Sequence, residues 1–153
     1  MAADALSNSE SSLDRRDGEQ TLEKADLSNA NLEGASFRGW NCAEVVLTNA
    51  NLLRVDFHAA DLQHANLRAA ELTGADLGEA ILVQATLKGA NLRLASLRDA
   101  NLQGADLKWS QLSGADLSGA NLSETLLQGA VADAATVWPK DFDFEAAGVW
   151  MSK

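Results

Sequence analysis

Residues 60–74 read ADLQHANLRAAELTG, a stretch in which alanine is followed two residues later by leucine and the pair recurs every five residues. We name the leucine position i and the alanine position i−2. Between residues 25 and 130 there are 22 i−2 positions, and 17 of them are Ala. Between residues 22 and 127 there are 22 i positions, and 19 of them are Leu, while position i−1 is mostly Asp or Asn. This regularity must decide the architecture of most of the chain.

A five-residue period fits neither the 3.6-residue period of a helix nor the two-residue alternation of a long strand. It suits a chain that turns after every few residues and sends positions i−2 and i inward each time. Small Ala and branched Leu can then stack on identical residues in the next coil, while backbone groups pair between coils at about 4.8 Å. Because a single repeat cannot bury its own apolar face, the pattern predicts a solenoid.

The segments ADLSNANLEGA at 25–35 and ADLSGANLS at 115–123 resemble the A(D/N)LXX signature of the pentapeptide-repeat proteins, most of all the cyanobacterial members. The resemblance covers residues 20–131. It implies an all-β fold, a right-handed quadrilateral parallel β-helix with four repeats in each coil. Residues 20–131 would then form about five and a half coils, a rod roughly 25–28 Å long.

The two ends of the chain depart from the repeat. Residues 1–19 are rich in Ser, Asp, Glu and Arg, and we expect either a disordered tail or a short helix that covers the first coil. Residues 132–153 contain a T-x-W-P…F-D…A-G-V pattern that resembles the C-terminal segment of cyanobacterial pentapeptide-repeat proteins. The last coil needs a cover over its open backbone edge and its core. The aromatic residues suited to that cap are Trp138, Phe142, Phe144 and Trp150.

The same aromatic side chains could instead form a contact between two copies of the chain. The sequence therefore leaves open a monomer or a dimer through the C-terminal segment.

Residues 40–46, WNCAEVV, are the main irregularity inside the repeat. Trp40 stands where alanine is usual, and its volume would overpack an ideal coil, while the neighbouring Cys42 is smaller than leucine. We interpret the pair as local repacking or a bulge, with a ligand-binding irregularity as the alternative. Because position i points inward, Cys42 is expected to be buried and unreactive.

Composition excludes several classes of function. The formal net charge of −10 argues against direct nucleic-acid binding, which needs clustered Lys and Arg. A single cysteine allows no intrachain disulfide and suits a reducing compartment. No apolar segment typical of a secretory signal or of a membrane span is present, so we expect a cytoplasmic protein.

The sequence shows no pattern typical of an enzyme. The only histidines, His58 and His64, are predicted to lie on different faces of the solenoid, and no metal-binding or phosphate-binding motif occurs. We therefore expect no catalytic residues, no metal and no cofactor.

Two sets of outward residues are candidates for partner binding. Arg68, Lys88 and Lys108 occupy position i+1 at intervals of 20 residues, with Trp109 directly after the last. Three like charges in a column repel one another unless they are solvated or countered, so the column is either a solvated face or a grip on an anionic or acidic partner, with Trp109 as an anchor. Ile81 and Val83 are expected on one face, as a small contact patch or as ordinary exposed side chains.

The function favoured by the sequence is a non-catalytic scaffold that binds a partner protein of unknown identity. The alternative, implied by family members linked to quinolone resistance, is an acidic mimic of DNA that binds a topoisomerase such as gyrase. Residues 20–131 hold 13 acids and 8 bases, a net of −5. Duplex DNA carries one negative charge per about 1.7 Å, hence about 15 charges over 25 Å. The net charge of −5 is about a third of that number, so the mimic is the weaker hypothesis.

Overall fold

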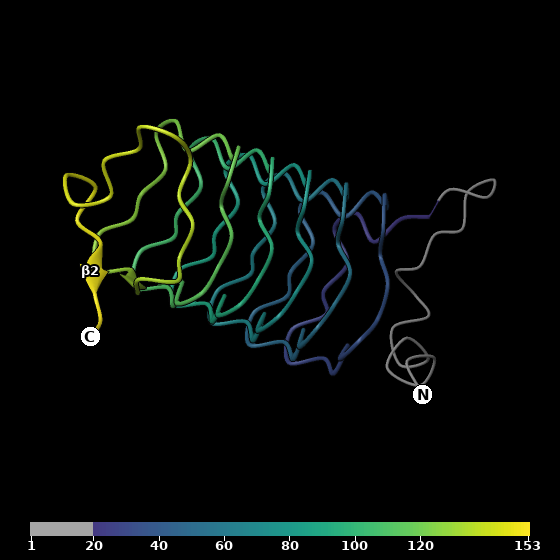
Figure 1. The fold of residues 1–153 in the computed structure, drawn as a ribbon. Helices are drawn as coiled ribbons and strands as arrows, with labels where there is room; N and C mark the ends of the chain where they lie inside the picture. Colours follow the sequence, from purple (N-terminus) through teal and green to yellow (C-terminus); the bar gives the residue numbers. More distant parts are fainter. Residues whose placement is uncertain (1–19) are drawn as a thin grey trace.

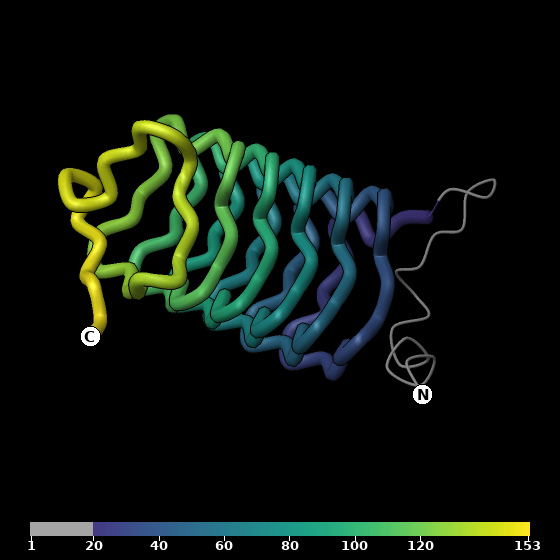
Figure 2. Tube along the Cα trace, viewed as in Figure 1, coloured from purple at the N-terminus to yellow at the C-terminus, as the bar shows by residue number. Residues whose placement is uncertain are grey.

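The computed structural model describes residues 20–153, and these form a solenoid of stacked coils (Figures 1 and 2). Parallel bridges join each coil to the next, as in Thr21↔Asn41, Asn41↔Asp61 and Asp61↔Ile81. Among residues 20–153 there are 20 isolated bridges, and 19 of them connect residues that are 20 positions apart. Four repeats therefore make one coil, as the resemblance to pentapeptide-repeat proteins implies. The expected tail of residues 1–19 lies outside the described residues.

Backbone hydrogen bonds between coils pair most of the backbone N–H and C=O groups of each repeat. In the first repeat, the Leu22 N–H donates to the Asn41 carbonyl at 2.7 Å and the Lys24 N–H donates to the Ala43 carbonyl at 2.9 Å. The Ala25 N–H donates to the Leu22 carbonyl at 3.0 Å and closes the turn. The N–H of position i+1 is left without a backbone acceptor, and a backbone donor seldom stays unpaired.

The Asp or Asn at position i−1 supplies the missing acceptor. The Ser28 N–H donates to Asp26 Oδ1 at 3.0 Å, and the Gly78 N–H donates to Asp76 Oδ1 at 2.9 Å. Asx side chains are suited to this bond because they reach a backbone N–H two residues ahead. The preference for Asp and Asn at this position is thus a consequence of how the corner of each coil is built.

The turns also explain where most of the glycines occur. Position i+2 has a positive φ throughout, for example 58° at Lys24, 61° at Asn29 and 69° at Gly89. Glycine adopts this conformation without steric cost and asparagine tolerates it. Bulkier residues at this position adopt the same conformation because backbone hydrogen bonds to the neighbouring coil fix the turn.

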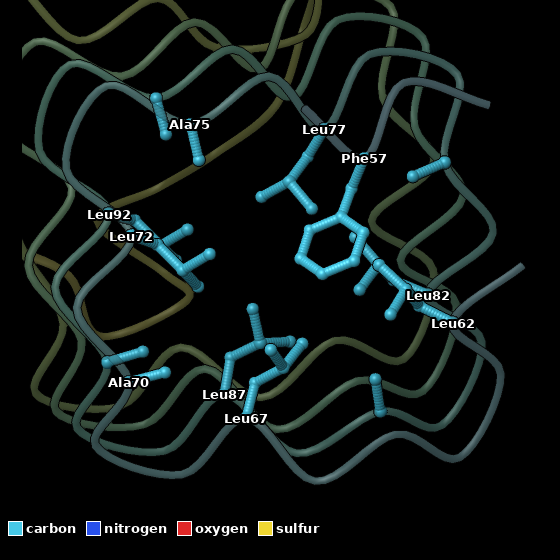
Figure 3. Close-up of a cluster of buried hydrophobic side chains, with 14 of the residues drawn as sticks. Phe57, Leu62, Leu67, Ala70, Leu72, Ala75, Leu77, Leu82, Leu87 and Leu92 are labelled. Carbon is cyan, nitrogen blue, oxygen red and sulfur yellow. The ribbon is translucent and has the colours of Figure 1, made fainter. Parts of the chain in front are cut away.

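Leucine and alanine fill the interior in columns that run along the rod. Leu62, Leu67 and Leu82 are completely buried, and they lie around Phe57 in the close-up of Figure 3. Phe37 stacks on Phe57 with ring centroids 5.3 Å apart, so the two aromatic exceptions occupy successive places in one column.

The irregularity at residues 40–46 is accommodated by side-chain packing without a bulge. The bridges Asn41↔Asp61 and Val46↔Asn66 keep the 20-residue register. Trp40 is half-buried, packs against the core and meets the ring of Phe37 edge-on at 5.2 Å. Cys42 is fully buried.

The pairing continues beyond residue 131, where the repeat ends in the sequence. Strand β1 (Val131–Ala132) pairs in parallel with strand β2 (Trp150–Met151), in the register Val131↔Trp150. The bridge Asp116↔Val137 spans 21 residues, so one residue is inserted in this coil. The buried Thr136 hydroxyl donates to the Leu112 carbonyl at 2.9 Å and ties the altered coil to the one before it.

The residues between the last coil and β2 lie at the C-terminal end of the rod (yellow in Figure 1). Trp138 stacks with Phe142 at 5.5 Å and with Phe144 at 5.6 Å, and all three pack against the core. Trp150 does not join this cluster: its backbone pairs with β1, but its side chain is 63% exposed. Within residues 20–153, no helix has the length and apolar character that crossing a membrane would require.

We predict that Ser110→Ala stabilises the protein. Ser110 is fully buried in a position usually held by alanine, and its hydroxyl has no hydrogen-bond partner among the described residues. Removing an unpaired buried hydroxyl should raise the free energy of unfolding by about 1 kcal/mol. Thermal denaturation should show a rise in Tm of about 3 °C. Ser96→Ala, at an outward position, is the control and should leave Tm nearly unchanged; a lower Tm for Ser110→Ala would contradict the prediction.

We also predict that Cys42 resists alkylation in the native protein. Burial, and then the negative charge of Asp61, raises the pKa of the Cys42 thiol from 9.0 to about 12. At pH 8.5 iodoacetamide should therefore modify the thiol only after denaturation, as measured by mass spectrometry. Because the folded pKa is the higher one, the thiol's contribution to stability is complete below pH 9 and declines as the pH rises towards 12. Rapid alkylation of the native protein would contradict this assignment.

Candidate functional site

The basic ladder, which we define as Arg68, Lys88 and Lys108, lies along one face of the solenoid. The bridges Asn66↔Thr86 and Thr86↔Asp106 place the three repeats in consecutive coils of that face. Arg68 is exposed, and Lys88 and Lys108 are half-buried. Lys108 Nζ lies 3.6 Å from Asp106 Oδ2. Within residues 20–153, Arg68 and Lys88 form no ion pair.

Trp109 stands at the corner directly after the ladder. Its φ is 63°, in the left-handed region, which costs a residue with a side chain about 1 kcal/mol. The indole lies over Gly129 in the next coil, where an added Cβ would come within 2.3 Å of the ring. Gly129 therefore leaves the space that Trp109 occupies.

Trp150 meets Trp109 edge-on, with ring centroids 6.3 Å apart. We name these two residues the aromatic pair; the side chains are 53% exposed for Trp109 and 63% for Trp150. The sequence places Trp150 in the C-terminal cap, and nothing in the repeat indicates its position beside Trp109. Trp150 lies there because β2 pairs with β1, which places Trp150 opposite Val131.

Ile81 and Val83 belong to a different face from the ladder. Ile81 bridges Asp61 and Asn101, and it is 38% exposed, while Val83 is half-buried. The structure therefore does not combine this pair with the ladder. Leu94, at a corner, is far more exposed, at 70%.

A shallow hollow of about 230 Å³ lies on a third face, around His58. His58 Nδ1 is 3.6 Å from Asp76 Oδ2, and His58 Nε2 is 3.7 Å from Glu79 Oε1. The imidazole occupies space that Gly78 leaves free, since a Cβ there would lie 2.9 Å from Nδ1. Sequence reasoning missed this hollow, although Gly78 stands 20 residues after His58 and is flanked by acids.

The chemistry of this hollow is that of a weakly acidic surface. Its rim also includes Asp99 and Arg98, and Arg98 Nη1 pairs with Asp116 Oδ2 at 3.0 Å. Among residues 20–153, no three side chains of the types that bind metals are gathered into a possible ion site. The carboxylates are suited to hold a cationic side chain of a partner.

The repeat matches the family model for pentapeptide repeats in eight copies, and the matched segments include residues 25–63, 41–78, 50–89, 70–108, 80–119 and 110–136. No curated protein sequence matches the chain.

Solved structures show the same similarity. A pentapeptide repeat protein of Nostoc PCC 7120, alr5209, is 28% identical with a TM-score of 0.51, and the match covers 99% of this chain and 96% of that one. HetL of the same cyanobacterium, involved in heterocyst differentiation regulation, is 22% identical with a TM-score of 0.53, covering 98% and 92%. QnrB1, a plasmid-mediated fluoroquinolone resistance protein, is 19% identical with a TM-score of 0.57, covering 87% and 80%. At these identities HetL and QnrB1 show the fold alone.

The match to the family model spans most of the solenoid, and its repeats coincide with the inward Ala and Leu columns described above. The chain belongs to the pentapeptide repeat family.

Proposed function

We propose that this protein is a non-catalytic scaffold that binds a partner protein through the outward side chains of a right-handed quadrilateral β-helix. Pentapeptide repeat proteins are generally structural or interaction proteins, which supports the proposal. We place the scaffold in the cytoplasm, where a single free cysteine is stable, and as a monomer or as a dimer through its C-terminal segment.

The observation that carries the proposal is the difference in residue types between inward and outward positions. The inward columns are almost uniformly Ala and Leu, whereas the outward residues differ from coil to coil in size and charge. Because the coil spacing is constant, at about 4.8 Å, the outward side chains are held at regular intervals on a rigid support. Extended repeat proteins use such surfaces to bind other proteins.

A topoisomerase-binding mimic of DNA is the second candidate, and one face of the solenoid gives it some support. That face carries five acids: Asp56, Asp76, Glu79, Asp99 and Asp116. From Asp56 to Asp116 the chain rises by three coil steps, or about 14 Å, over which duplex DNA carries about eight charges. Arg38 and Arg98 further neutralise Asp56 and Asp116 at 3.8 and 3.0 Å. The charge density therefore favours the scaffold.

The scaffold proposal is tested by affinity capture from an extract of the protein's own cells. The immobilised folded chain should retain a specific protein in saturable amounts, and the same chain denatured by heat should not. The retained protein is then purified and its binding measured by calorimetry. If no protein is retained by the folded chain above the denatured control, the scaffold proposal is wrong.

We predict that the purified protein leaves gyrase activity unchanged. Because its acidic face is sparser than DNA, it should compete poorly for a DNA-binding groove. A supercoiling assay with protein titrated to about 10 µM should give a flat response, with a competing DNA duplex as the positive control. Inhibition within that range would instead favour the mimic.

A further inference from the structure

We infer that the basic ladder and the aromatic pair form a single docking site for an extended acidic segment of a partner protein. The segment would carry carboxylates on alternate residues, followed by a large apolar side chain. This inference rests on the proposed scaffold function and names the chemistry of its partner.

The charge of the ladder's face is the first support for this site. The repeats on that face contain three bases, in the ladder, and two acids, Asp26 and Asp106, in a chain whose formal net charge is −10. Lys108 is already paired with Asp106. Arg68 and Lys88 have no carboxylate within ion-pair distance in the described part of the chain, so both cations can pair with a partner. A local basic strip on an acidic molecule attracts a short acidic segment and aligns it.

The aromatic pair is the second support. Trp109 and Trp150 keep more than half of their side-chain surface exposed, although each ring is held by a neighbour. Gly129 supports the Trp109 ring from the next coil. Leu126, exposed on the face of the ladder, adds apolar surface next to Asp106. Preorganised tryptophans are frequent hot spots of protein interfaces because they bury much surface at little entropic cost.

The spacing of the site suits an extended chain that runs along the rod. Two coil steps separate Arg68 from Lys108, about 10 Å along the axis. An extended segment places alternate side chains about 6.7 Å apart, so two or three carboxylates can reach the three flexible basic side chains. Since Trp109 directly follows Lys108, the next large side chain of the segment would meet the aromatic pair. A nucleic acid fits less well, because its many phosphates would face the acids of the neighbouring faces.

The test uses the full chain and a fluorescein-labelled peptide in which three aspartates alternate with serines and are followed by tryptophan and leucine. Fluorescence anisotropy at about 50 mM salt should give a micromolar Kd that weakens as salt is raised. The double variant Arg68→Gln/Lys88→Gln should weaken binding about fivefold, and Trp109→Ser about tenfold. Trp150→Ser is a second anchor variant that keeps the test valid if Trp109→Ser fails to fold.

The matched control is Arg54→Gln/Arg93→Gln, which removes the same charge from the repeats of another face. It should change the Kd by less than about twofold. The inference is overturned if the peptide does not bind, if the control weakens binding as much as the ladder variant, or if a thymidine oligonucleotide binds more tightly than the peptide.

Capture from the cell extract separates this inference from the scaffold proposal. If the ladder variant retains the same partner as the unmodified chain, the docking site is refuted while the scaffold stands. If neither chain retains a partner, the scaffold proposal fails, and this inference fails with it. Loss of the partner from the ladder variant but not from the control variant supports both.

Discussion

The whole structure depends on backbone hydrogen bonds between successive coils, most of which join residues 19 or 21 positions apart. The bond from the Leu22 N–H to the Asn41 carbonyl is repeated, with its equivalents, along the length of the rod. Because these bonds hold successive coils at a constant separation, each inward side chain must fit against a residue in the same place one coil away. Only a small residue at i−2 and a compact apolar residue at i satisfy that condition in every coil.

The exceptions show how far this condition can be relaxed. Phe37 and Phe57 replace leucine in successive coils and stack face to face, so their larger volume is accommodated in one column. Trp40 replaces alanine but remains half-buried, and the bridges around it keep their register. In both places side-chain packing absorbs the change, since a shift of the backbone would break hydrogen bonds to two neighbouring coils.

The outward positions are free of this condition, and they are where a function can be encoded. The turn position that holds Gly89 in one coil holds Trp109 in the next, and φ is positive in both. The ladder, the hollow around His58 and the aromatic pair all use outward positions, and none of them disturbs a core column. The family's scaffold thus permits many surfaces on one support, and the fold does not by itself select among them.

Much of the fold could be read from the sequence because its contacts repeat with a fixed period. The inward columns and the turn glycines follow from counting residues in steps of five. The alignment of Arg68 with Lys88 follows from the 20-residue coil that the resemblance to pentapeptide-repeat proteins implies. Asp and Asn at i−1 were visible in the sequence as a preference, but their role as acceptors for the i+1 N–H required coordinates.

Beyond residue 131 the period ends, and so does this kind of prediction. Trp138, Phe142, Phe144 and Trp150 are similar in the sequence, yet only the first three pack against the core, while Trp150 turns outward to Trp109. One inserted residue before Val137 and the pairing of β2 with β1 decide that difference. The sequence alone determined the repeating interior, because each coil is constrained by an identical neighbour. Tertiary structure decided the C-terminal end, where no further coil dictates the direction of each side chain.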